Sequence, residues 1–129
     1  MDTLEIGKVI TSVLLGNDAI SRQLGDRVYP LVADEGTMFP FLIYRRSSLQ
    51  PASTKDGMHS CTAYVDIAIA TERYGEGILI AKAVKDVLTS SHGILSGISI
   101  DEISLTDAGE EYAANAFVQN LTFKIEIDE

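Results

Sequence analysis

The sequence predicts an α+β domain in which an antiparallel β-sheet packs against a long helix, with one or two helices near the N-terminus. The stretch from residue 60 to residue 91 carries most of this prediction. In its first half every second residue is apolar, which is the period of a strand with one buried face. In its second half apolar residues recur every three or four positions, as in a helix that packs back on a sheet. The strand set is Cys61, Ala63, Val65, Ile67 and Ile69, and the helix set is Ile80, Ala81, Val84, Val87 and Leu88. Thr71 lies where the period changes, and we expect its hydroxyl to accept a hydrogen bond from a first-turn amide as the N-cap.

Two shorter helices are predicted before this unit. Asp2 and Glu5 have the spacing of a capping box ahead of the first helix, which Gly16 ends. Asn17 is the predicted N-cap of the second helix, and Gly25 is its predicted C′ residue. The inward residues are expected to be Ile6, Val9, Ile10, Val13 and Leu14 in the first helix and Ile20 and Leu24 in the second.

Two strands are predicted between these helices and residue 60. Residues 28–32 are prone to form a strand, but Pro30 cannot donate to a ladder, so we expect an edge strand or an extended arm. Residues 41–48 form the second strand, which is apolar on both faces. One face is expected to lie on the core, and the other beneath a loop or a partner. The polar residues 47–58 are predicted to be a long hairpin connection, a kind of loop that is often functional.

The C-terminal third is predicted to complete the sheet. Residues 94–105 form two short strands or one strand with a bulge, because the alternation slips at Asp101-Glu102. Residues 106–114 are expected to be an acidic loop. The last strand covers residues 115–127, with Phe117, Leu121, Phe123, Ile125 and Ile127 facing inward.

Length and charge restrict the functions that the chain can have. A length of 129 residues fits one domain, residues 1–129. Nineteen acidic against ten basic residues give a net charge of −9, which argues against wrapping nucleic acid and against binding an anionic membrane surface. No apolar run approaches the ~20 residues that span a bilayer, and the first residues lack the basic segment of a secretory signal. A single cysteine favours a reducing compartment.

Three groups of residues could support chemistry, and each has a simpler interpretation. The turn from Gly75 to Gly77 lies where a phosphate-binding loop would open a helix, but the third glycine is absent and Glu76 is negative, which favours an ordinary turn. His59 and Cys61 share a strand face, yet a metal site needs two further ligands, so a rim histidine beside a core thiol is favoured. The acidic segment 101–111 lacks calcium-loop spacing, and a solvated acidic face is its usual meaning.

Other residues point to contacts between subunits. Adjacent strand positions must point to opposite faces, so Arg45 and Arg46 diverge; they could form salt bridges within the chain or reach a neighbouring subunit's carboxylates. Ile78 and Leu79 lie off the core stripe of their helix. They are buried by the preceding loop or form an apolar patch that meets another subunit.

Several segments, taken in order, resemble the small tail-completion, or tail-terminator, proteins of long-tailed phages and prophages. They are L-G-D-R-V-Y-P at residues 24–30, F-P-F-L-I-Y at 39–44, Y-V-D-I-A-I at 64–69, the Ala- and Val-rich helix, and the closing L-T-F-K-I-E-I. The resemblance covers nearly the whole chain. The acidic segment 101–111 departs from the usual pattern of these proteins.

The resemblance implies a structural protein that transforms no substrate and needs no cofactor or metal. It implies a homo-oligomeric ring, typically a hexamer, that caps the tail tube, contacts the tube protein and the head connector, assembles in the host cytoplasm and ends at the head-proximal end of the virion tail. The alternative is a small-molecule-binding or enzymatic domain that uses the Gly75–Gly77 turn or the acidic segment. The expected interface residues are Arg45, Arg46, Leu49, Lys55, Met58, Ile78, Leu79, Asp107, Glu110 and Glu111.

Overall fold

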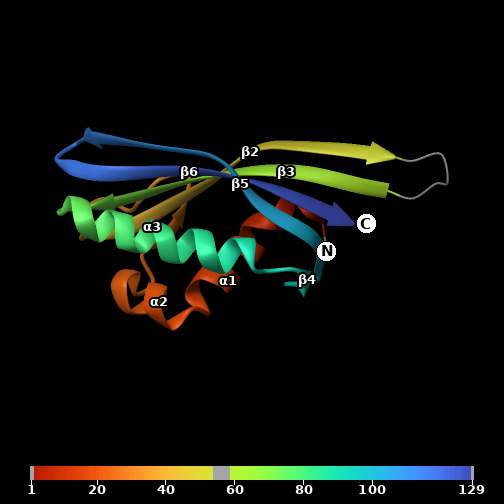
Figure 1. Cartoon of the computed structure of the whole chain (residues 1–129), viewed down its shortest axis with the longest axis horizontal. Coiled ribbons are helices and arrows are strands. Elements are labelled where there is room, and N and C mark those ends of the chain that lie inside the picture. Colours follow the sequence, from red (N-terminus) through yellow and green to blue (C-terminus); the bar gives the residue numbers. More distant parts are fainter. Residues whose placement is uncertain (1, 54–58, 129) are drawn as a thin grey trace.

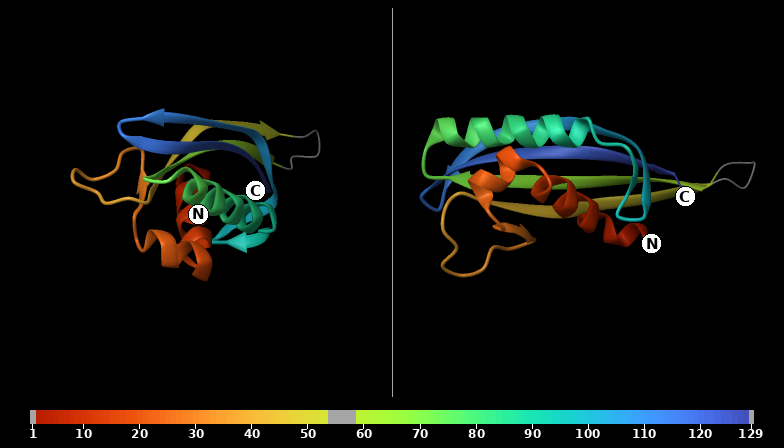
Figure 2. Two further views of the ribbon diagram at one scale, coloured as in Figure 1. Left: turned by 60° about the vertical axis from the view of Figure 1, so that its left-hand side comes forward. Right: turned by 90° about the horizontal axis from the view of Figure 1, so that it is seen from below.

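The computed structural model describes residues 2–53 and 59–128, and within them one six-stranded sheet carries all the helices on one side (Figure 1). The strand order is β1-β2-β3-β6-β5-β4. The elements are η1 (Thr3–Glu5, a 3-10 turn), α1 (Ile6–Leu15), α2 (Asp18–Leu24), β1 (Val28–Pro30), β2 (Phe41–Ser53), β3 (His59–Thr71), α3 (Tyr74–Thr89), β4 (Gly93–Leu95), β5 (Ile98–Ala113) and β6 (Ala116–Asp128). The α+β prediction is therefore confirmed. Figure 2 shows α3 and α1 lying along the sheet, while the paired strands β2 and β3 run on beyond the helices at one end.

The sheet is mixed, whereas the sequence pattern predicted an antiparallel sheet. β1 pairs in parallel with β2, in the register Val28 to Leu42 and Pro30 to Tyr44. The other four pairings are antiparallel. The segment 31–40 carries the chain back before β2 begins, so β2 runs in the direction of β1. As predicted from Pro30, β1 is an edge strand.

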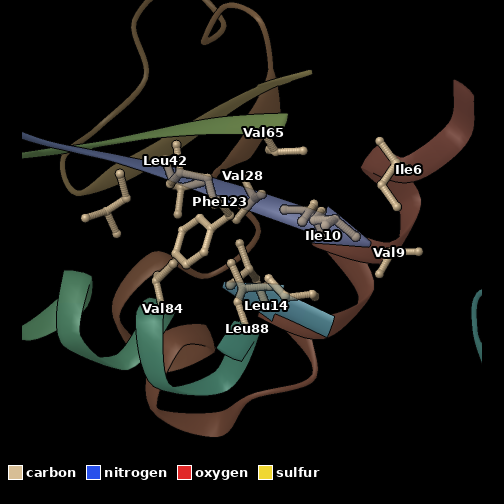
Figure 3. Close-up of a cluster of buried hydrophobic side chains, with 14 of the residues drawn as sticks. Ile6, Val9, Ile10, Leu14, Val28, Leu42, Val65, Val84, Leu88 and Phe123 are labelled. Carbon is tan, nitrogen blue, oxygen red and sulfur yellow. The ribbon is translucent and has the colours of Figure 1, made fainter. Parts of the chain in front are cut away.

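The core fills the space between the sheet and the helix layer. Phe123 of β6 lies near its centre, between Leu42 of β2 and Val84 of α3 (Figure 3). The alternating apolar residues of β3 are all buried, and so is most of the predicted stripe of α3, with Val87 partly buried. The alternation of apolar residues therefore identified both β3 and its buried face.

The N-terminal helices begin and end where their capping residues predicted. The Asp2 carboxylate accepts from the Leu4 amide at 2.8 Å and caps η1, which leads into α1. The Asn17 side chain accepts from the Ile20 amide at 3.1 Å and caps α2. Gly25 follows α2 with φ of 61°, a conformation that glycine adopts without the steric cost of a Cβ atom.

Thr71 is not the N-cap of α3, so that prediction was wrong. The helix begins at Tyr74 with Arg73 as its N-cap, and no side chain caps it. The Thr71 hydroxyl instead donates to the Arg73 carbonyl at 2.8 Å. Because β3 extends through Thr71, the hydroxyl lies before the turn and faces a carbonyl instead of a first-turn amide.

Two segments that were predicted to be loops are largely strand. Residues 47–53 continue β2 and pair with β3 as far as Ser53 opposite His59. Residues 106–113 continue β5 and pair with β6 as far as Ala113 opposite Ala116. Both segments are polar, which suggested loops, but backbone pairing with a regular neighbouring strand needs no apolar side chains. The register of β5 shifts between Ile100 and Glu102, which confirms the predicted bulge, and β4 forms a separate short strand.

Candidate interaction surfaces

One end of the outer sheet face, the face away from the helices, is an apolar hollow of about 200 Å³. Phe41 and Ile43 of β2 lie on it, beside alanines of β3, β5 and β6, and the rings of Phe39 and Phe41 stack at 5.5 Å between centroids. The hollow is lined by Phe39, Phe41, Ile43, Ala68, Ala70, Ala113, Ala114, Ala116 and Val118. Phe41 and Ile43 are half-buried, although the helices lie on the other side of the sheet. The predicted second apolar face of this strand is therefore present.

A second hollow of about 490 Å³ adjoins this surface and contains a polar network. Arg45 donates to Asp66 at 2.8 Å, and the Thr122 hydroxyl donates to the other carboxylate oxygen of Asp66 at 3.0 Å. The Arg45 side chain is 60% exposed, so this pair contributes little to stability. Its guanidinium can still contact a partner.

Arg46 points to the opposite face, as the strand period predicted. Its guanidinium donates to the Leu4 carbonyl at 2.6 Å, which ties β2 to the start of the N-terminal helical segment. Both arginines therefore have partners within the chain and remain exposed. Leu49 is half-buried on the helix side of the sheet, opposite Ala63. Lys55 and Met58 lie outside the described residues.

The two apolar residues of α3 behave differently. Ile78 is half-buried, whereas Leu79 is 67% exposed. Leu79 borders a shallow groove of about 130 Å³ between α2 and α3, together with Ala19, Gln23 and Ala83. The preceding segment therefore does not bury Leu79, and Leu79 is an exposed apolar residue on the helix layer.

The acidic residues of β5 lie on both faces of the sheet. Asp107 and Glu111 are opposite Thr122 and Val118, on the outer face, and Glu110 is opposite Gln119, on the helix side. The Glu110 carboxylate accepts from the Gln119 amide at 2.9 Å and from the Tyr74 hydroxyl at 2.9 and 3.0 Å. The hydrogen bonds from Gln119, then Tyr74, lower the pKa of Glu110, and the carboxylate raises the pKa of Tyr74.

Three aromatic residues, Tyr74, Tyr112 and Phe117, line the same hollow as this carboxylate. Phe117 makes edge-to-face contacts with Tyr74 and Tyr112, at centroid distances of 5.9 and 5.0 Å. The cluster joins the start of α3 to the end of the β5–β6 hairpin. Sequence reasoning missed it because Glu110 was assigned to a loop. The spacing of Glu110 and Tyr112, both on one face of a strand, was the available signal.

Among the described residues, two of the candidate chemical groups are explained by packing. Gly77 lies in the first turns of α3 and packs on the sheet, where a Cβ atom would be 3.0 Å from the Thr71 hydroxyl and 3.5 Å from Gln119. Cys61 is buried on the inner face, and the side chain of His59 lies outside the described part. Across residues 2–53 and 59–128, no three histidine, cysteine or carboxylate side chains gather in a way that could hold a metal ion. In the same ranges, every helix is too short or too polar to cross a bilayer.

Comparison with known proteins identifies the family of the chain. The sequence profile of the family described as "Tail completion protein gp17" matches residues 8–128. The chain belongs to the tail-completion protein family. The resemblance drawn from the short apolar segments is thereby confirmed, and this tail-completion protein is a structural component of a virion tail.

A solved structure supports the architecture of this tail-completion protein. One chain of "Virion of native gene transfer agent (GTA) particle" matches with a TM-score of 0.80 at 16% sequence identity, covering 93% of this chain and 92% of that chain. At this identity the likeness establishes the fold. No curated protein matches the sequence.

Proposed function

We propose that this tail-completion protein forms a homo-oligomeric ring, a hexamer, that caps the tail tube and joins it to the head connector. The observation that carries the proposal is the family match over residues 8–128. Such a ring would assemble in the host cytoplasm and remain at the head-proximal end of the virion tail. It would act by shape, because a closed ring gives the tube an end on which further tube subunits cannot add.

The surfaces of the protomer support an assembly role. The apolar hollow on the outer sheet face lies away from the helix layer, and contiguous exposed apolar surface of this kind marks contacts with other proteins. Leu79 exposes a second apolar position on the opposite layer. Contact surfaces on both layers suit a subunit that meets the tube and the connector in addition to its neighbours in the ring.

The direct test uses purified tube protein. Tubes are polymerised with and without the tail-completion protein, and their length distribution and ends are measured by electron microscopy. We expect shorter tubes that carry a ring at one end. Light scattering of the tail-completion protein alone measures whether the ring closes without the tube.

A monomer at every concentration, together with unchanged tube length, would contradict the proposal. A ring that forms only on tube ends would support it, so the tube experiment decides. A pull-down with the connector protein tests the second contact separately. If the tubes are capped but the connector protein does not bind, the function is limited to capping.

A further inference from the structure

β2 and β5 are long strands that each have a short strand, β1 or β4, as the neighbour on one side. The short strands cover only part of these edges. β1 pairs with residues 42–44 of β2, and among the described residues 45–53 of β2 have strand pairing on the β3 side alone. β4 pairs with residues 98–100 of β5, and 101–113 of β5 likewise pair only with β6. Each protomer therefore presents two unpaired strand edges, one on each flank of the sheet.

Unpaired edges of this length invite pairing with another strand, and soluble proteins usually protect them. Here the protection is partial. β2 has a register shift between Arg46 and Ser48, and Pro51 lacks an amide donor. The register of β5 shifts for the last time between Leu105 and Asp107, after which 107–113 form a regular ladder with β6. Regular strand with a vacant outer edge is left at 48–50 and at 107–113.

The charges on the two edges are opposite. Residues 101–113 contain Asp101, Glu102, Asp107, Glu110 and Glu111 and no basic residue, whereas residues 45–53 contain Arg45 and Arg46 and no acidic residue. Like charges directly opposite each other destabilise a strand pair, and unlike charges stabilise it. Two β5 edges or two β2 edges would therefore repel each other, while a β2 edge and a β5 edge would attract.

The strand faces and directions are also compatible. Arg45 lies opposite Asp66, and Asp107 lies opposite Thr122, which itself pairs with Asp66, so both side chains are on the outer face. β2, β3, β6 and β5 alternate in direction. A neighbour's β2 placed beside β5 would continue that alternation as an antiparallel pair.

We propose that the occupant of each edge is a second copy of this chain: the basic β2 edge of one protomer pairs with the acidic β5 edge of the next. This inference rests on the proposed ring and specifies how it closes. The contact is head-to-tail, because each protomer uses different edges toward its two neighbours. Such contacts form a ring when the rotation from one protomer to the next closes, and an open filament when it does not. In this arrangement the acidic segment contacts the neighbouring protomer and is not simply a solvated surface.

Disulfide trapping tests the pairing. In a Cys61→Ala background, Ser48→Cys is combined in turn with Asp107→Cys, Gly109→Cys and Glu111→Cys, all on the outer face. A disulfide requires Cα atoms about 4.4–6.8 Å apart, so only adjacent edges cross-link. We expect at least one combination to give a ladder of covalent oligomers ending at a closed species, and the single-cysteine variants to give none. Covalent dimers of a single-cysteine variant would overturn the inference. So would the absence of a ladder in every double-cysteine combination when light scattering shows that rings have formed.

Charge exchange provides an independent test. One variant carries Arg45→Glu and Arg46→Glu, and the other carries Asp107→Lys and Glu111→Lys. Each alone should need at least about tenfold more protein to assemble. The first variant brings acidic side chains to the acidic β5 edge, and the second brings two lysines to the edge that meets Arg45 and Arg46. A 1:1 mixture should assemble, since alternating the two variants restores opposite charges at every contact.

The control matched to the arginine variant is Lys82→Glu with Lys85→Glu, which replaces two basic residues by two acidic ones at exposed positions of α3. It should assemble like the unmodified protein. Circular dichroism confirms folding of each variant. Folded variants whose mixture fails to assemble, or equal impairment by the control, would count against edge pairing. If rings still form in that case, the proposed function stands; if the unmodified protein forms no ring and does not affect tubes, both fail.

Discussion

Single residues determine how closely α3 approaches the sheet near its N-terminal end. Gly77 is buried there, with the Thr71 hydroxyl and Gln119 at contact distance from where a Cβ atom would be. Thr71 is fully buried and its hydroxyl already donates to the Arg73 carbonyl, so it cannot easily move. The glycine that resembled part of a phosphate-binding turn is explained by this close packing.

We expect Gly77→Ala to lower the free energy of unfolding by about 1 kcal/mol, because strain against Thr71 outweighs the gain in helix propensity. The matched control is Gly75→Ala, where no atom lies within 4 Å of the added Cβ. It should stabilise by up to ~0.5–1 kcal/mol. Urea unfolding followed by circular dichroism measures both changes. Equal effects of the two substitutions would refute the packing argument.

The hydrogen bonds to Glu110 make a pH-dependent contribution to stability. Its pKa is lowered first by Gln119 and then by Tyr74. A carboxyl group with a lower pKa in the folded state stabilises the protein above its unfolded pKa of about 4.3, and this contribution is lost as the pH falls through the folded pKa. The contribution of Glu110 should therefore be lost in acid.

Tyr74→Phe tests this contribution while keeping the ring that contacts Phe117. We expect the pKa of Glu110 to rise partway to its ordinary value, because the larger effect, from Gln119, remains. NMR titration of the Glu110 side chain measures the shift, and unfolding between pH 3 and 7 measures its consequence. An unchanged Glu110 titration would show that the Tyr74 hydrogen bond is not maintained in solution.

At the scale of elements, the β5–β6 hairpin turns through two residues that both have positive φ. These are Ala114 at 51° and Asn115 at 62°, between the paired residues Ala113 and Ala116. Two-residue turns of this kind match the twist of the strands and favour asparagine or glycine. Asn115 fits this preference, whereas the left-handed conformation costs an alanine about 1–2 kcal/mol.

Ala114→Asn should therefore raise the free energy of unfolding by about 0.5 kcal/mol, since asparagine tolerates this conformation better. Ala113→Asn is the control: this neighbour is also exposed but lies in the strand, where asparagine is disfavoured. Thermal and urea unfolding should separate the two. A gain from both substitutions would mean that the effect is not due to the turn.

The sequence predicted the elements wherever one face is buried, and it failed where pairing alone defines the strand. The inner face of β3 and the stripe of α3 were found because burial imposes a period on them. Residues 106–113 are exposed on both faces, so no period marks them as strand. For the same reason the spacing of Glu110 and Tyr112 was not recognised as a strand face, and the Glu110 cluster was missed. The parallel pairing of β1 was missed because direction depends on the path of 31–40, which no local pattern encodes.

At the scale of the whole molecule, the distribution of charge matters more than its total. Each protomer has a net charge of −9, so bringing copies together is opposed by long-range repulsion. The proposed contacts between the β2 and β5 edges are attractive but local. The two effects differ in range, and salt therefore separates them.

Salt should first strengthen and then weaken self-assembly. The screening length is about 30 Å at 0.01 M and ~8 Å at 0.15 M salt, so moderate salt removes repulsion between whole protomers while charges within a few ångströms still attract. Above about 0.5 M the edge contacts are also screened. Light scattering at fixed protein concentration from 0.01 to 1 M sodium chloride should pass through a maximum. In the Arg45→Glu, Arg46→Glu variant the attraction is absent, so assembly should only rise with salt; a maximum there as well would place the attractive charges elsewhere on the protomer.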